Sequence, residues 1–273
     1  MSRFYEPADR PKRFYAKADA GPAEGGFAVR LDGRTPRSPQ GRLLALPTQA
    51  LAELVAEEWA AQGDFILVAT MPATRLAWSA IERIPGAHAE TAAEIARFAR
   101  TDLVCYFADG PAALVERQER HWGPLLDWAE QSLGARFHRA QGVTHRPQPA
   151  DAIARIEALA LAEDDFALAG LAFGAALVGS AVLAFALRRG ELTAEAAFQL
   201  SRLDETFQEE RWGVDAEAAE RADAMAAEAV MLERWFEALD PARMAAWRLA
   251  RMGGSEPGLK IPRRRRSRPA RKS

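Results

Sequence analysis

The chain is poor in the residues that usually carry metal, redox or nucleotide chemistry. Its 273 residues include one cysteine, so no internal disulfide can form, and the apolar neighbours of Cys105 predict a buried side chain. None of the four histidines has E-x-x-H or H-x-x-x-H spacing. No glycine-rich run ends in Gly-Lys-Ser/Thr, and no G-x-S-x-G elbow is present. We therefore expect no metal, no cofactor and no catalytic residue of these kinds.

The sequence also lacks a clear targeting or membrane segment. Its first residues hold neither an apolar signal core nor an acid-free amphipathic presequence, which predicts a cytoplasmic protein. The run 166–187 is uncharged and by length alone could span a bilayer. Alanine and glycine dominate it, Gly170 and Gly174 have small-xxx-small spacing, and Gly179-Ser180 is a candidate break. We interpret it as two close-packed core helices and expect no membrane insertion, with a membrane span as the alternative.

Charge is distributed unevenly along the chain. The net charge is −2, yet residues 260–272 hold eight cations and no acid, so the remainder carries −10. Residues 253–273 predict a flexible basic tail. Clustered arginines could bind nucleic acid or acidic lipid, which is one alternative function. Because interleaved aromatics and a folded reader motif are lacking, and an acidic body repels polyanions, we expect no nucleic-acid partner.

Residues 1–72 predict a small β-rich domain. Phe27, Val29 and Leu31 alternate toward one face and are followed by a turn signal at Asp32-Gly33. A second turn is predicted at 38–41, so the strands are short and antiparallel. A single helix is expected at about 48–62, with apolar residues at helical spacing. These are Leu51, Leu54, Val55 and Trp59.

Residues 73–245 predict a larger, all-helical domain. Helical periodicity dominates after Met71-Pro72, and Pro124 is expected to force a kink or a restart. Strands first and helices afterwards indicate an α+β chain with an N-terminal antiparallel β-rich domain and a C-terminal helical one.

The run Leu203–Asp215 is the most unusual part of the helical region. Glu205, Gln208, Glu209 and Trp212 are spaced i, i+3, i+4, i+7 and so share one helical face. A buried face is expected to be apolar, and a solvated one rarely carries tryptophan. The mixture favours a surface that another molecule contacts. The alternative is an ordinary helix end, in which Trp212 is a partly buried anchor.

In that alternative, Gly213 stops one helix and Asp215 caps the next. Carboxylates elsewhere leave room for a second function, a carboxylate-dependent hydrolase of unknown substrate. Asp204 with Glu205 is the best candidate pair, but adjacent helical residues diverge by about 100° and would not converge on one atom.

Ordered short motifs resemble one family, the assembly chaperones that guard the alpha subunit of the F1 sector of ATP synthase in mitochondria and alphaproteobacteria. The matching pieces are Arg13-Phe14-Tyr15, Leu31-Asp32-Gly33-Arg34, Leu46-Pro47-Thr48, Glu58-Trp59 with Gln62, Met71-Pro72, Thr101-Asp102-Leu103, Trp122-Gly123-Pro124-Leu125, Gly179-Ser180, and Leu203-Asp204-Glu205 with Gln208, Glu210, Trp212-Gly213 and Asp215. Together they run in family order from about residue 12 to about residue 220. Phe207, Tyr106-Phe107 and the arginine tail depart from the family pattern.

The resemblance implies a non-enzymatic protein that binds the unassembled F1 alpha subunit, prevents its aggregation and releases it for pairing with the beta subunit. No small-molecule substrate is implied. Members share the outline of a β-rich domain followed by a helical one. Such a client exposes surfaces that normally face another subunit, and tryptophan anchors with an acid and amide rim suit their coverage. We therefore expect the following residues to meet the client: Glu205, Gln208, Glu209, Trp212, Asp204, Glu58 and Trp59.

Two of these expectations are more specific. Glu205 is expected to make a charge-assisted contact with a client donor, and either Trp212 or Trp59 to pack at the domain junction. For Trp59 a core position is the main alternative, because it continues the stripe of Leu51 and Val55.

Overall fold

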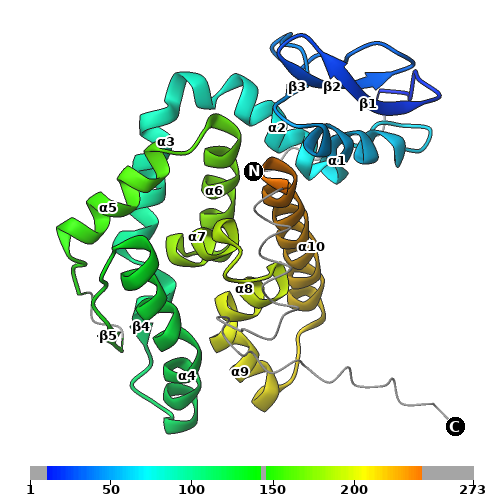
Figure 1. Cartoon of the computed structure of the whole chain (residues 1–273). Coiled ribbons are helices and arrows are strands. Elements are labelled where there is room, and N and C mark those ends of the chain that lie inside the picture. The colour runs from blue at the N-terminus through cyan, green and yellow to red at the C-terminus, as the bar shows by residue number, and fades with distance from the viewer. Residues whose placement is uncertain (1–10, 143–145, 242–273) are drawn as a thin grey trace, which may run out of the picture.

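The first part of the protein is a small antiparallel sheet covered by one helix (Figure 1). The computed structural model describes residues 11–142 and 146–241. The elements are β1 Ala18–Ala23, β2 Gly26–Leu31, β3 Ala45–Leu46 and α1 Gln49–Ala60. The strands lie in the order β1-β2-β3, with Ala18 paired to Leu31 across the β1–β2 hairpin. The predicted short antiparallel strands and single helix are confirmed.

Helix α1 begins at a threonine that has two roles. The Thr48 hydroxyl oxygen accepts a hydrogen bond from the Leu51 amide at 3.1 Å, which caps the helix, and the hydroxyl donates to the Ala238 carbonyl at 2.6 Å. The predicted stripe is buried, with Val55 fully enclosed and Trp59 5% exposed. One side chain thus starts the helix and ties it to a segment 190 residues away.

The remainder of the described chain is helical apart from a short parallel strand pair, which confirms the α+β class. The larger elements are α2 Pro72–Glu82, α3 Ile84–Arg100, β4 Tyr106–Phe107, α4 Ala112–Trp128, β5 Ala140–Gln141, α5 Ala150–Leu161, α6 Asp165–Val178, α7 Ala181–Arg189, α8 Ala194–Ser201, α9 Leu203–Trp212 and α10 Ala216–Leu239. Short 3₁₀ turns occupy Val68–Thr70 and Leu103–Cys105, and a π turn occupies Ala129–Leu133.

The uncharged run 166–187 forms two packed helices, α6 and α7, as predicted. Gly179 adopts φ 65° between them, and the Ser180 hydroxyl accepts from the Leu183 amide at 3.0 Å to cap α7. Gly170 and Gly174 let α6 approach α10 closely. Within residues 11–142 and 146–241, none of the helices has the length and hydropathy that crossing a membrane requires.

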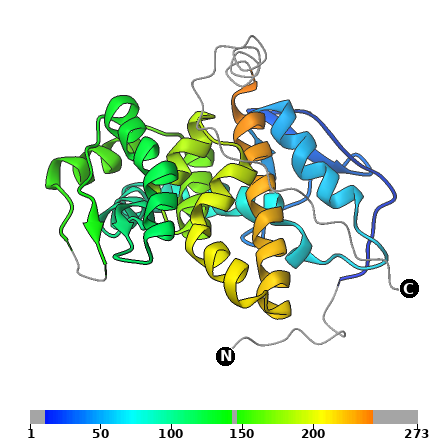
Figure 2. The same ribbon diagram turned by 90° about the horizontal axis from the view of Figure 1, so that it is seen from below.

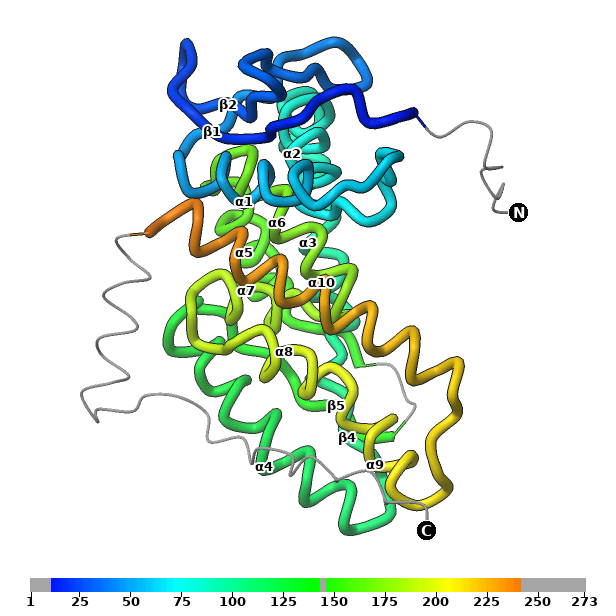
Figure 3. The backbone as a smooth tube through the Cα atoms, turned by 90° about the vertical axis from the view of Figure 1, so that its right-hand side faces the viewer, coloured from blue at the N-terminus to red at the C-terminus, as the bar shows by residue number. Residues whose placement is uncertain are grey.

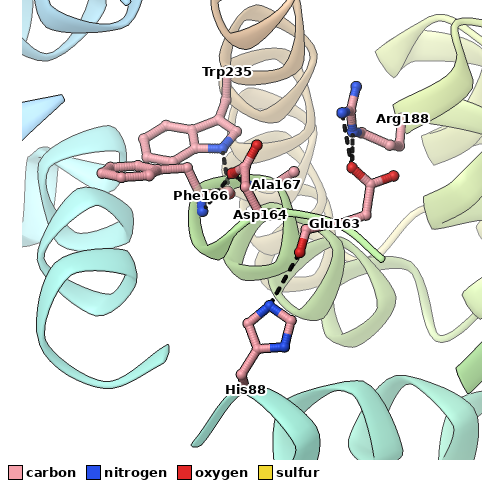
Figure 4. Close-up of polar contacts among 7 residues, drawn as sticks. All are labelled: His88, Glu163, Asp164, Phe166, Ala167, Arg188 and Trp235. Carbon is pink, nitrogen blue, oxygen red and sulfur yellow. Dashed lines mark hydrogen bonds and ion pairs between the residues drawn. The ribbon is translucent and has the colours of Figure 1, made fainter. Parts of the chain in front are cut away.

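The connection between α5 and α6, together with the first turn of α6, is tied to three other helices (Figure 4). The Glu163 carboxylate accepts a hydrogen bond from Arg188 of α7 at 2.9 Å, and both side chains are largely buried. His88 Nε2 of α3 lies 3.0 Å from the Glu163 carbonyl oxygen. The Trp235 indole N–H of α10 donates to the Phe166 carbonyl at 3.1 Å. These bonds fix α6 and α7, which in turn contact α8.

Helix α10 runs from the side of α9 to the side of α1 (Figure 3). Viewed from below, it lies between the sheet with α1 on one side and the remaining helices on the other (Figure 2). Buried apolar residues form one cluster that extends from Val29 of the sheet to Trp235 of α10. One core thus joins the sheet region to the helical region. The division into separate domains, 1–72 and 73–245, stays a prediction.

Three further expectations have different outcomes. Helix α4 continues through Pro124, which excludes a restart there and leaves the expected kink a prediction; the π turn follows α4 at Ala129–Leu133. Cys105 is fully buried, as predicted. The basic segment 253–273 lies outside the described residues.

Candidate functional site

Helix α9 is anchored on its inner face by two buried apolar side chains, Leu203 and Phe207. The Phe207 ring contacts two cations, with the guanidinium of Arg117 at 5.1 Å and that of Arg211 at 4.2 Å from the ring centroid. Arg117 belongs to α4, so this contact fastens α9 to α4. Phe207, a departure from the family pattern, therefore has a structural role in this chain.

The C-terminal end of α9 and the start of α10 are formed as predicted. Gly213 follows the last helical residue with φ 91°, a conformation that residues with a Cβ rarely adopt. The Asp215 carboxylate then accepts a hydrogen bond from the Ala218 amide at 2.8 Å and caps α10. Helix α9 thus ends at a glycine, and a capped α10 follows that glycine after two residues.

The outer face of α9 carries three of the four predicted stripe residues in exposed positions: Glu205, Gln208 and Trp212. Trp212 is 78% exposed. The interpretation of Trp212 as a partly buried anchor is wrong, and it does not pack at a domain junction. Glu209 is mostly buried and forms a 2.7 Å ion pair with Arg202, so its carboxylate already has an internal partner. We call Glu205, Gln208 and Trp212 the α9 stripe.

Asp204 points inward, away from the α9 stripe. Its carboxylate accepts a hydrogen bond from the Gln118 side-chain amide at 2.7 Å. Gln118 is fully buried, and its oxygen accepts from the Ala108 amide at 2.7 Å. Burial raises the pKa of Asp204, which the bond from Gln118 opposes. These contacts hold α9 against α4, and the expectation that Asp204 meets a client stays a prediction.

Glu58 and Trp59 both have internal partners, Trp59 occupies the core position given as its alternative, and contact of either residue with a client stays a prediction. The Glu58 carboxylate accepts hydrogen bonds from the Ala73 amide at 2.7 Å and from the Thr74 amide and hydroxyl, each at 2.8 Å, so it caps α2 from outside that helix. Burial raises the pKa of Glu58, and these bonds oppose the rise. Trp59 packs edge-on against Tyr15, whose hydroxyl donates to the Trp59 carbonyl at 2.7 Å. Sequence reasoning missed the capping role because Ala73, the nearest residue that Glu58 caps, lies fifteen residues after it.

The acids with raised pKa do not converge on one site. Glu58, Asp102 and Asp204 lie in separate parts of the fold, and each accepts hydrogen bonds from neighbouring groups. This separation counts against the carboxylate-dependent hydrolase. In the part of the chain that the structure describes, no cluster of three or more histidine, cysteine and acidic side chains is placed to hold a metal ion.

The sequence did not reveal a hollow of about 1000 Å³ beside α9, lined by residues of α4, α8, α9 and α10. Its lining mixes apolar side chains such as Phe198 and Leu203 with paired charges. Arg117 bonds Glu210 across it at 2.8 Å. Glu209 belongs both to this hollow and to the face predicted from the sequence, so the hollow and the α9 stripe are neighbours. Four helices far apart in the chain create it, and no local pattern predicts such a feature.

Comparison with known proteins identifies the family. A family model described as ATP12 chaperone protein matches residues 12–130. The solved structure of Atp12 from Paracoccus denitrificans is similar over 83% of this chain and 97% of its own, with 40% identity and a TM-score of 0.78. The chain belongs to the ATP12 chaperone family. The resemblance inferred from the ordered motifs is thereby confirmed.

Other ATP12 relatives agree. The Atu1473 protein from Agrobacterium tumefaciens is 42% identical, with a TM-score of 0.79 over 84% of this chain and 87% of its own. Protein atp12, mitochondrial, from Schizosaccharomyces pombe is 26% identical over 215 residues, 74% of each chain. This ATP12 family member is a chaperone of ATP synthase assembly, and that membership points away from an enzyme.

Proposed function

We propose that this ATP12 family member binds the unassembled F1 alpha subunit, keeps it from aggregating, and releases it for pairing with the beta subunit. Its membership of the ATP12 chaperone family supports a role in assembly, and the family resemblance implies the alpha subunit as client. The proposal makes the protein a holder of a folded or folding partner and not an enzyme. It also predicts a cytoplasmic location, which corresponds to the mitochondrial matrix for eukaryotic relatives.

The observation that carries this proposal is the α9 stripe. An indole that is 78% exposed at the end of a helix leaves a large apolar surface in water. Trp212 packs in no internal cavity, and Glu205 and Gln208 beside it supply an acceptor and an amide. The residues that contribute most to binding at a protein interface are usually aromatic anchors surrounded by a polar rim.

The same composition is compatible with release. Stable interfaces bury roughly 800 Å² on each partner, but their affinity depends on a few anchors. One exposed tryptophan with acid and amide neighbours can hold a client firmly without the extensive apolar surface of a permanent dimer. The beta subunit could then displace the chaperone by covering the same client surface more completely.

Co-expression with the F1 alpha subunit tests the proposal. We expect a one-to-one complex on affinity purification, and we expect Trp212→Ala and Glu205→Lys to reduce alpha-subunit recovery on the order of tenfold each. Both side chains are exposed, so circular dichroism and the Tm should be unchanged.

Matched controls separate the stripe from general surface effects. Phe14→Ala removes another exposed aromatic, 71% accessible in the N-terminal region, and Glu90→Lys reverses an exposed acid on α3. Neither should alter recovery. Full binding by the folded Glu205→Lys variant would remove Glu205 from the contact surface, and no complex with the wild-type chain would refute the client assignment.

A further inference from the structure

The hollow beside α9 has the dimensions of a helix-binding groove. We call it the α8–α10 groove, after helices that form its sides. One side is the stretch of α10 from Ala219 to Val230, which at about 1.5 Å per residue is roughly 16 Å long. Three helical turns about 10 Å across occupy roughly 1250 Å³, which is comparable with the groove volume of about 1000 Å³.

Apolar surface lies open at both ends of this α10 side. Val214, in the connection before α10, is 59% exposed, and Val230 is 49% exposed. Between them the groove is lined by the small side chains of Ala219, Ala222 and Ala226, facing Phe198 of α8. Two exposed valines joined by an apolar floor form a surface that water solvates poorly.

The walls decide which secondary structure the groove can accept. Every residue that lines it belongs to a helix or to a short connection between helices. Helical walls use their backbone N–H and C=O groups internally and offer no strand edge. An extended segment would enter with its own backbone groups unpaired, whereas a helix brings them already bonded. A helix is therefore the occupant that avoids the desolvation cost.

The charges of the lining select a cationic occupant. Arg117 pairs with Glu210 and Arg202 pairs with Glu209, so these four charges cancel. Three acids remain without an ion-pair partner among the described residues, against one cation. They are Glu116, Glu195 and Asp223, and the cation is Arg120.

His121 also lines the groove and does not offset this negative charge. Burial, with Arg120 and Arg117 nearby, lowers the pKa of His121, which keeps its ring neutral at pH 7.

We propose that a helix of the unassembled F1 alpha subunit, apolar on one side and flanked there by lysine or arginine, lies in the α8–α10 groove. This inference rests on the proposed function and names the part of the client that the site takes. The helix packs along α10 as an added member of the bundle, with its cations near Asp223 and Glu195. The α9 stripe lies on the same helix as Glu209, which lines the groove, and contacts the client beside this helix.

Site-specific crosslinking identifies the occupant. A photo-crosslinking phenylalanine analogue replaces Val230 in the full chain, which is co-expressed with the alpha subunit; the same replacement of Phe14 is the control. A crosslink to an alpha-subunit helix from position 230 alone supports the inference. A crosslink to residues 242–273 of the same chain, or to a second copy of it, overturns it.

Blocking the groove gives an independent test. Ala226→Trp fills it, and we expect alpha-subunit recovery to fall about tenfold. Ala224→Trp places the same side chain on the exposed face of α10 and should leave recovery unchanged. Should Ala226→Trp fail to fold, Val230→Glu alters an exposed position and serves instead.

Charge reversal completes the test. Asp223→Lys should weaken binding, with the loss greatest at low salt, whereas Glu220→Lys on a neighbouring exposed position of α10 should not. If wild-type chain binds the alpha subunit and the folded groove variants bind equally well, this inference fails while the proposed function stands. If wild-type chain does not bind it, the proposed function itself fails.

Discussion

Single carboxylates in this chain differ in role according to what surrounds them, and Asp102 is the most enclosed. Asp102 is fully buried. Its carboxylate accepts hydrogen bonds from the Ser180 hydroxyl at 2.5 Å, the Val182 amide at 3.0 Å and the Val104 amide at 3.3 Å. Burial raises its pKa to about 6, against the effect of these bonds. Asp102 thus joins the turn before β4 to the start of α7.

The raised pKa of Asp102 predicts a specific pH dependence. Because the folded protein holds this proton more tightly than the unfolded chain, Asp102 contributes stability that falls as the pH rises from about 4 to about 6. Asp102→Asn lacks this dependence and turns an N–H donor toward the Val182 amide, which should destabilise the protein by about 1–3 kcal/mol at pH 7.

Urea unfolding at two pH values checks this prediction. The difference in the free energy of unfolding between wild type and Asp102→Asn should be larger at pH 4.5 than at pH 7. An equal difference at both values would contradict the assigned pKa direction. Ser180→Ala, which removes one donor and keeps the carboxyl, serves as the control.

At the scale of elements, the contact between α6 and α10 depends on two glycines. A Cβ at Gly170 would lie 2.6 Å from the Phe236 ring and 3.1 Å from Trp235, and one at Gly174 would lie 2.8 Å from Leu232. The Trp235 side chain is held by its bond to the Phe166 carbonyl and cannot readily move. The small-xxx-small spacing therefore positions α10, whose other face lines the groove.

Gly170→Ala should destabilise the protein despite the better helix propensity of alanine. Propensity favours alanine by about 1 kcal/mol, but overpacking a close contact costs about 1–3 kcal/mol, so a net loss of about 1 kcal/mol is expected. Gly86→Ala is the matched control, because no atom lies within 4 Å of its added Cβ and α3 should tolerate it. The Tm of each variant, measured by thermal unfolding and compared with that of the wild type, tests this prediction. An increase in Tm for Gly170→Ala would refute the tight contact.

Across the whole molecule, α10 joins the sheet region to the helical region. The Ala238 carbonyl accepts a hydrogen bond from the Thr48 hydroxyl, and Arg234 forms an ion pair with Glu57 of α1 at 2.6 Å. The apolar core is continuous between the two parts. Regions that share one core usually unfold together.

We therefore expect a single calorimetric transition, with calorimetric and van't Hoff enthalpies in agreement. Arg234→Ala should leave that single transition intact, since the Arg234–Glu57 pair is exposed and adds little to stability. Two separate transitions would instead show that residues 1–72 and 73–245 unfold as independent domains.

Much of the fold could be predicted because its signals are local. Thr48, Ser180 and Asp215 cap helices whose first turns follow them at once, and Leu51, Val55 and Trp59 repeat at the period of the helix that buries them. Sequence patterns within ten residues thus determined the order of strands and helices, and the ordered motifs determined the family.

The tertiary structure alone decided which acids are available to a partner. Asp204 and Glu205 are adjacent, yet Asp204 bonds Gln118, 86 residues away, while Glu205 faces water. Glu58 caps a neighbouring helix, and four helices distant in sequence enclose the groove. A helical pattern gives the angle between side chains, but only the packing of distant elements determines which angle faces the interior.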